Sequence, residues 1–521
     1  MERLTLAWLA FGLYMAVTAG LAWMGHKRTD SLESFAVGRR DMGPWLVGIT
    51  MAAAMSSTAT FIINPGFVYT HGIAAFLHFG VAIGLGIAVA LFVLSLGFRR
   101  AGVQDGSLSL PHWIGARFGS SGLRVFFGAL SLLSITFVVL IVGGVQIMLQ
   151  QTLDLSAGAA LALTILFVFS YILVGGTYAH TYTNTLQGLL MVGVALIILV
   201  KTAGVLVEPT FWADLQARFP QLLGLVNPHP VPEAAHIPAL FGDVFSVYVA
   251  GVVIGFAVVC QPHLLTKALY LKRDEDVKKY VGVTLLVTAI FFSLLLAGLA
   301  AHATLTPGQV PQDRIMATWL AGQFGDASFV LISVALVAAG MSTLDGILVA
   351  MSTIAGSDLV LPLAERRWLR GRSAEAKARF GWRAGQVTLV LMGVAAWLIC
   401  LHPPKLLGLF GQLGVYGLFA GAVGPVVLAI ARPRDACRFK RVAQATALTG
   451  AGATSRCISG LAPQPGRHRH LGHPRGRRRR RGRDGLGPAV RRSHLRRLRR
   501  RRLIGCAARS AIVSGGPGGP S

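Results

Sequence analysis

Apolar segments of about 20 residues recur along this chain from its first residues to Arg432. A helix of that length crosses the hydrocarbon core of a bilayer, which is about 30 Å thick. The chain is 54% hydrophobic and only 13% charged, a composition that soluble domains do not have. The sequence therefore predicts an all-α polytopic membrane protein. The first segment lacks a small-residue cleavage site, so we expect a retained helix and not a signal peptide.

We count eleven spans in the sequence. They cover roughly residues 4–25, 43–70, 74–97, 124–150, 157–175, 181–206, 240–262, 280–302, 327–356, 385–401 and 406–431. The connections after spans 1, 3, 7, 9 and 11 are rich in lysine and arginine, whereas those after the even-numbered spans are poor in both. Basic loops stay in the cytoplasm. This alternation predicts a multi-pass protein of a bacterial plasma membrane, with its N-terminus outside and its C-terminal tail inside.

The eleven spans divide into one extra helix and two sets of five. We expect span 2 to be interrupted by "NPG" at residues 64–66 and span 7 to end in "CQPH" at residues 260–263. A repeat of five helices reverses orientation, and interrupted helices at matching places in two inverted halves are typical of secondary transporters. The expected segments are a first helix and loop (1–42), a first repeat (43–206), an external loop (207–239), a second repeat (240–432) and a tail (433–521).

The tail differs in composition from the rest of the chain. From Ala445 onward it has 19 arginines, no lysine and one acidic residue, Asp484, so it cannot bury a core. Arginine without lysine, mixed with glycine, proline, histidine and alanine, is what GC-rich codons give in another reading frame. We therefore interpret the tail as frameshifted; a genuine disordered tail on anionic lipid is the alternative. Without aromatic residues for base stacking, nucleic-acid binding is not expected.

Polar residues lie in the middle of span 9, which contains "AAGMSTLDG" with Ser342, Thr343 and Asp345. Residues three and four apart share a helix face, so Ala339 and Ser342 can present oxygens to an alkali cation. Further oxygens would come from span 2, where Pro65 releases backbone carbonyls around Ile62. Carbonyls near Ala53 to Ser56 would need a second unwinding, which the sequence "SSTAT" allows but does not demand. In the alternative interpretation, both hydroxyl groups bond the carbonyls one turn back.

Four motifs together resemble the sodium:solute symporter family. "AAGMSTLDG" is similar to the signature of its ninth helix, and "VVCQPHLLTKAL" to the end of its seventh. "VGGTYAHTYTNTLQG" is similar to its helix 5–6 junction and "NPGFVYTHG" to the end of its second helix. The resemblance covers about residues 5–432. It implies the inverted-repeat fold of the amino-acid transporter LeuT with one helix added in front, and sodium-coupled import of a small organic solute.

The resemblance also implies a sodium site and a solute site. The sodium ligands would be the carbonyl oxygens of Ala53, Ser56 and Ala339 and the hydroxyl groups of Ser342 and Thr343. The candidate solute-binding residues are Ser57, Thr58, Gln146, Ile254 and Val258. The last two replace aromatic residues of the family's proline transporters, which argues against proline. Asn184 stands where the family usually has aspartate, on the ion exit path, so that path lacks a charge.

Neither a nucleotide-binding motif nor a catalytic constellation occurs, since the glycine-rich "GLGIAVAL" lies within a span and lacks a lysine. We expect no enzyme activity and no organic cofactor, with sodium as the coupling ion. A carboxylate such as a monocarboxylate or pantothenate is the expected solute, and the oligomeric state stays open. The alternatives are a proton-coupled or uncoupled facilitator of the same fold, a transporter-like sensor domain and a non-functional product. His180 and His263 are expected at the inner face, solvated or capping, with a proton relay as the alternative. Asp345 is expected as a structural partner or in a water-facing position.

Overall fold

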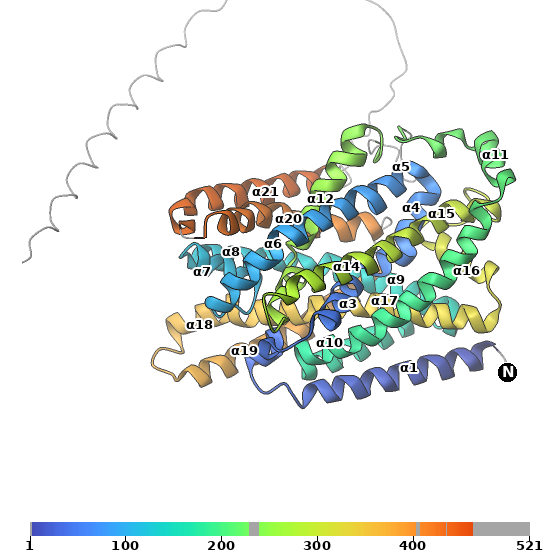
Figure 1. Cartoon of the computed structure of the whole chain (residues 1–521). Helices are drawn as coiled ribbons and strands as arrows, with labels where there is room; N and C mark the ends of the chain where they lie inside the picture. Colours follow the sequence, from blue (N-terminus) through green and yellow to red (C-terminus); the bar gives the residue numbers. More distant parts are fainter. Residues whose placement is uncertain (1–2, 229–238, 403–406, 434, 462–521) are drawn as a thin grey trace, which may run out of the picture. The chain divides into compact units, whose positions relative to one another are not determined.

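The computed structural model describes residues 3–228, 239–402, 407–433 and 435–461. Within these ranges the chain is helical, apart from connections and two isolated β-bridges. The main helices are α1 (Arg3–His26), α3 (Pro44–Met55), α4 (Asn64–His71), α6 (Ile83–Gln104), α9 (Ile135–Leu153), α10 (Ala157–Leu206), α12 (Ala250–Val259), α14 (Asp276–Ser293), α17 (Asp326–Thr353), α19 (Ala374–Cys400), α20 (Leu407–Ala431) and α21 (Lys440–Leu461) (Figure 1). The fold class predicted from the sequence is confirmed.

Among the described residues, seven helical segments are long and apolar enough to cross a membrane, and two bent pairs of helices qualify when each pair is taken together. One of the seven, α10, has 50 residues and is about 75 Å long, more than twice the thickness of a hydrocarbon core. Gly176 divides it, with φ 53° and ψ −143°, a conformation that only glycine adopts readily. The two halves of α10 correspond to the expected spans 5 and 6, and α20 corresponds to span 11. The count of eleven stays a prediction.

Helix 2 is broken, but not where the sequence predicted. α3 ends at Met55, and the chain becomes helical again in a π-helical turn, Ala59–Ile63, that leads into α4. The two parts meet at 54°. The interruption predicted at residues 64–66 is wrong, because the helix runs on through Pro65 from Ala59 to His71. The π-helical turn ahead of the proline, in which the Asn64 N–H bonds to the Ala59 carbonyl, accommodates its missing N–H.

Helix 7 is broken at the predicted motif. α12 ends at Val259, and Gln261 is extended, with φ −64° and ψ 140°. The helical segment does not end there, as the range 240–262 implied. It continues through α13 (Pro262–Leu265) and η8 (Thr266–Tyr270), bent by 58° from the first part.

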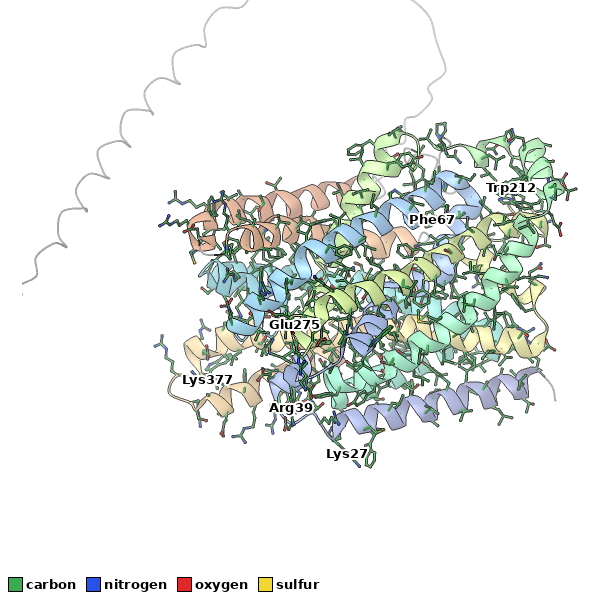
Figure 2. All side chains as sticks on the ribbon, viewed as in Figure 1. Lys27, Arg39, Phe67, Trp212, Glu275 and Lys377 are labelled. Carbon is green, nitrogen blue, oxygen red and sulfur yellow. The ribbon has the colours of Figure 1, made fainter. Side chains whose placement is uncertain are left out.

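The basic connections lie together at one end of the helices. Arg40 donates to the Ser107 carbonyl at 2.9 Å, and Arg99 pairs with Asp274. The labelled side chains of Lys27, Arg39 and Lys377 lie toward this end, and Trp212 lies at the opposite one (Figure 2). This end is called the basic end below. Its existence agrees with the alternation of charge along the sequence.

The first part of the predicted tail contains a helix. Residues 440–461 form helix α21, which packs along α20. Ala443 and Ala447 are buried, and a side chain at Gly450 would overlap the backbone of Ala420. Small residues therefore allow close helix packing that the arginine-rich composition obscured. The rest of the predicted tail, from residue 462 onward, lies outside the described residues.

Candidate functional site

The break in helix 2 places free backbone oxygens beside α17. The carbonyls in the last turn of a helix have no intrahelical partners. The carbonyl of Ala53, in the last turn of α3, lies 3.0 Å from the Ser342 hydroxyl oxygen. The same hydroxyl donates to the carbonyl of Ala339 at 2.8 Å, the bond one turn back that the alternative interpretation expects for Ser342. Three of the five predicted sodium ligands therefore converge on one point between two helices.

The residues of the other two predicted ligands, the Ser56 carbonyl and the Thr343 hydroxyl, both have buried side-chain oxygens without partners. The side-chain oxygens of Ser56 and Thr343 make no hydrogen bond in the part of the chain that the structure describes. Both residues are fully buried, and Ser56 has left the helix, with φ −101° and ψ 76°. A buried hydroxyl without a partner costs about 1–3 kcal/mol. Thr343 thus departs from the alternative interpretation, in which its hydroxyl bonds one turn back.

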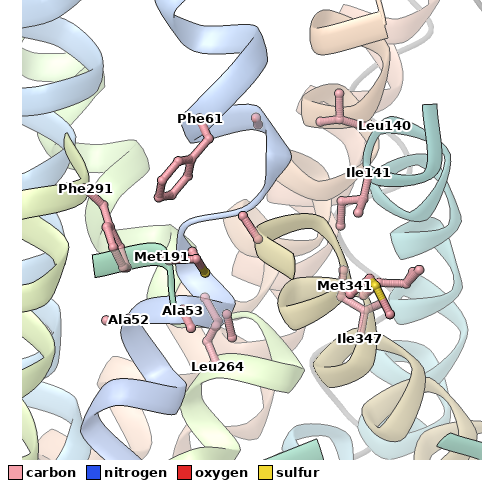
Figure 3. Close-up of a cluster of buried hydrophobic side chains, with 14 of the residues drawn as sticks. Ala52, Ala53, Phe61, Leu140, Ile141, Met191, Leu264, Phe291, Met341 and Ile347 are labelled. Carbon is pink, nitrogen blue, oxygen red and sulfur yellow. The ribbon is translucent and has the colours of Figure 1, made fainter. Parts of the chain in front are cut away.

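Apolar side chains lie close to this point. The Met191 Sδ lies 4.0 Å from the Ser342 hydroxyl oxygen, and Figure 3 shows Met191 beside Ala52 and Ala53, with Phe61 beyond the break in helix 2. All four residues are buried. Because these side chains exclude water, attraction between a cation and the converging oxygens is stronger than it would be in solution.

Asp345 receives the structural role that the sequence suggested. Its carboxylate accepts hydrogen bonds from the Tyr171 hydroxyl at 2.5 Å and from the Thr183 hydroxyl at 3.0 Å. Both donors belong to α10, and they lie on opposite sides of Gly176. The carboxylate thus joins α17 to both halves of α10.

Asn184 lies directly behind the converging oxygens. Its side-chain amide donates to the Ser342 carbonyl at 2.9 Å, and its own side-chain oxygen has no partner among the described residues. An aspartate at this position could donate no hydrogen bond to that carbonyl unless it were protonated. The asparagine therefore provides a hydrogen bond to the helix that carries Ser342 and Thr343.

A cavity of about 90 Å³ lies between the two broken helices. Its polar lining consists of Ser57, Thr60, Asn64 and Gln261. Its apolar lining includes Ala54, Met55, Phe79, Ile254, Val258 and Phe292. None of the lining residues carries a charge. The side-chain oxygen of Asn64 has no partner among the described residues and is available to a ligand.

The structure divides the predicted solute-binding residues into two groups. Ser57, Ile254 and Val258 line the cavity, whereas Gln146 on α9 does not. Thr58 does not line it either, because its side chain fills the space left by Gly144 and Gly340. The sequence reasoning missed Thr60, Asn64 and Gln261. Asn64 and Gln261 could have been found, because each directly precedes a proline of a broken helix, Pro65 or Pro262.

Comparisons with known proteins agree with this geometry. The model of the "Sodium:solute symporter family" matches residues 35–450. The sodium/pantothenate symporter of Haemophilus influenzae is 24% identical over 427 residues, covering 80% of this chain and 84% of that protein. The osmoregulated proline transporter OpuE of Bacillus subtilis is 23% identical over 437 residues, covering 81% and 82%.

Among solved structures, the substrate-bound, outward-open state of a Na⁺-coupled sialic acid symporter has a TM-score of 0.63. It is 17% identical, and the match covers 88% of this chain and 98% of that one, so it shows the fold. The family model covers most of the chain, and the structural match covers both repeats. The chain belongs to the sodium:solute symporter family and has its LeuT-like fold.

Proposed function

We propose that this protein imports a small organic solute together with sodium by alternating access. The unpartnered hydroxyl of Thr343, beside the converging oxygens of Ala53, Ala339 and Ser342, is the observation that carries this proposal. A sodium ion at this point would join the end of α3 to α17 and hold the break in helix 2 in one conformation. The solute cavity uses the next residues of the same break. Ion and solute therefore stabilise the same arrangement and bind cooperatively.

The driving force is the sodium gradient across the membrane. Each positive charge that enters also gains about 2.3 kcal/mol per 100 mV of membrane potential. None of the residues that line the cavity is charged, so the charge moved in each cycle is that of the ion and the solute alone. One sodium ion carried with a neutral solute moves one positive charge, whereas one sodium ion carried with a monocarboxylate moves none. The voltage dependence of uptake thus reports the charge of the solute.

The cavity favours a small solute with one polar end and an apolar remainder. Its polar groups lie at the starts of the second halves of both broken helices, where the helix dipole favours an anionic group. This supports a carboxylate, with pantothenate or a monocarboxylate as the leading candidates. Two similar proteins carry the name sodium/pantothenate symporter.

A solute panel in proteoliposomes tests the function. The full chain is reconstituted, and uptake of labelled pantothenate, monocarboxylates, amino acids, sugars and urea is measured with a sodium gradient and with choline in its place. We expect one solute class to accumulate only with sodium. Equal uptake in choline would instead establish a facilitator or a proton-coupled carrier.

Substitutions in the cavity are expected to weaken solute binding alone. Asn64→Leu and Gln261→Met each remove polar groups that line the cavity, and a lost hydrogen bond in a buried site costs about 1–3 kcal/mol. We expect the KM for the solute to rise at least about fivefold in each variant. Sodium binding without solute should stay unchanged. Gln146→Leu is the matched control, and an equal rise in its KM would place the solute elsewhere.

We also propose that the basic end faces the cytoplasm, which places the N-terminus outside. Arg379 lies near the start of α19 at that end, and Ala217 lies in α11 (Pro209–Arg218) at the opposite end; both are exposed. In intact cells, after the five native cysteines are replaced by serine, Ala217→Cys should react with a membrane-impermeant maleimide. Arg379→Cys should react only after lysis. The reverse pattern would invert the topology.

A further inference from the structure

A buried lysine and a buried histidine are paired across the inner part of the fold. Lys267 belongs to η8, in the second half of broken helix 7, and His180 belongs to α10. The Lys267 Nζ lies 2.5 Å from the His180 Nε2, and both side chains are 0% exposed. A buried lysine in a membrane segment is costly and is a candidate for a functional group. Neither residue contributes to the proposed sodium site or to the solute cavity.

The contact limits where the protons of the pair can lie. With Lys267 as an ammonium, which only donates hydrogen bonds, the His180 Nε2 accepts and the imidazole is neutral, with its proton on Nδ1. That Nδ1 has no hydrogen-bond partner among the described residues. While Lys267 and His180 are in contact, the pair therefore carries one positive charge. A second proton, on His180, would be shielded from water and would lie next to the Lys267 ammonium.

Few other titratable groups surround the pair. Asp345 on α17 acts electrostatically on Lys267, and the Tyr270 ring centre lies 5.7 Å from the Lys267 Nζ. His263 on α13 faces Gly346 together with His180. On the other elements packed against η8, the charged residues are engaged elsewhere: Glu33 with Arg40, and Arg99 and Arg100 with Asp274. The Asp345 carboxylate balances the single positive charge of the closed pair, but it would leave a second positive charge on the pair unbalanced.

We propose that Lys267 and His180 form a proton site at the inner gate. This inference rests on the alternating access proposed above, in which the second half of helix 7 moves away from α10 to open the basic end. Opening separates the pair and admits water to His180. The imidazole lone pair at Nε2 then takes a proton from the cytoplasm, and closing returns it. The proton accompanies the gate and does not cross the membrane.

The direction and size of the pH effect follow. Once solvated, His180 titrates like an ordinary histidine, with a pKa of about 6.5. The open state then binds more protons than the closed state, so acid favours opening. Between pH 7.5 and pH 5.5 the ratio of open to closed molecules should rise about tenfold.

Spin-label distances test the site without any transport. The labels are placed by Lys27→Cys, directly after α1, and Lys272→Cys, directly after η8, in the full chain with its native cysteines replaced by serine. Pulsed EPR without sodium or solute should show the open population rising about tenfold on acidification. His180→Gln should reduce the rise to less than about twofold, because no group is left to titrate.

Lys267→Met is a second variant that keeps the test independent of one substitution. Without the ammonium, His180 can take its proton opposite Asp345 while the gate is closed, so the rise should again be less than about twofold. His263→Gln is the matched control and should keep the full tenfold response. A full response in His180→Gln, or its loss in His263→Gln, overturns the assignment.

Sodium separates this inference from the proposed function. Added sodium should shift the labelled protein toward the closed inner end. A distance that responds to sodium but not to pH overturns the proton site and leaves sodium coupling intact. A distance that responds to pH but not to sodium overturns the sodium site and leaves the proton site intact.

Discussion

Thr343→Ala is expected to raise the sodium concentration for half-maximal uptake by about 10- to 100-fold. The substitution removes a buried hydroxyl that has no partner other than a bound ion. Interactions of a hydroxyl with a charged group contribute about 1.5–3 kcal/mol, which corresponds to this range of affinity. The cost in folding should be small, because no hydrogen bond of the described structure is lost. Sodium-dependent uptake and direct ²²Na⁺ binding measure the effect.

Thr353→Ala is the matched control for this experiment. Thr353 is also buried and lies on the same helix, but its hydroxyl donates to the Val349 carbonyl at 2.9 Å. It should leave the sodium affinity within about twofold of the unmodified protein. If Thr343→Ala keeps the normal sodium dependence, or if Thr353→Ala loses it equally, the sodium site does not lie at Thr343.

Asp345→Ala is expected to destabilise the protein by about 3–5 kcal/mol. Two hydrogen bonds to the carboxylate are lost, and the hydroxyl groups of Tyr171 and Thr183 lose an acceptor inside the protein. Thermal unfolding in detergent, followed by size-exclusion chromatography, measures the loss. Asp326→Ala is the control on the same helix, because its exposed carboxylate lies 3.8 Å from Arg3 and should contribute less than about 1 kcal/mol.

A double-mutant cycle separates the network from general damage to the core. Tyr171→Phe and Asp345→Asn each weaken the 2.5 Å hydrogen bond between their side chains. Because the two residues act as one unit, we expect a coupling energy above about 1 kcal/mol. Additive losses would show that Asp345 acts through something other than Tyr171.

The membrane spans could be predicted because apolar composition is a local property of each segment. The break in helix 7 could also be predicted, since Pro262 removes an N–H beside an extended glutamine. The predicted position of the break in helix 2 was wrong because a proline can either interrupt a helix or lie within one. At Pro65 the π-helical turn ahead of the proline lets the helix continue.

The candidate site was predictable only in part. The resemblance identified Ser342 and Thr343, but the partners of Asp345 lie 174 and 162 residues away in the sequence, beyond the reach of any local pattern. The same holds for the contact between Lys267 and His180, which lie 87 residues apart. His180 and His263 were expected to be solvated or to cap a helix, yet both are buried. Local hydropathy could not show this, because burial depends on which helices pack together.

Gly176 gives α10 a property that a straight helix lacks. It divides α10 into two helical arms, and the second arm carries Thr183, Asn184 and His180. The carboxylate of Asp345 accepts one hydrogen bond from a hydroxyl on each arm, which fixes the angle between the two arms. A tilt of the second arm must therefore either carry α17 with it or release one of these hydroxyls. The kink at Gly176 and the two hydrogen bonds of Asp345 therefore couple the proposed sodium site mechanically to the proposed exit path and the proposed inner gate.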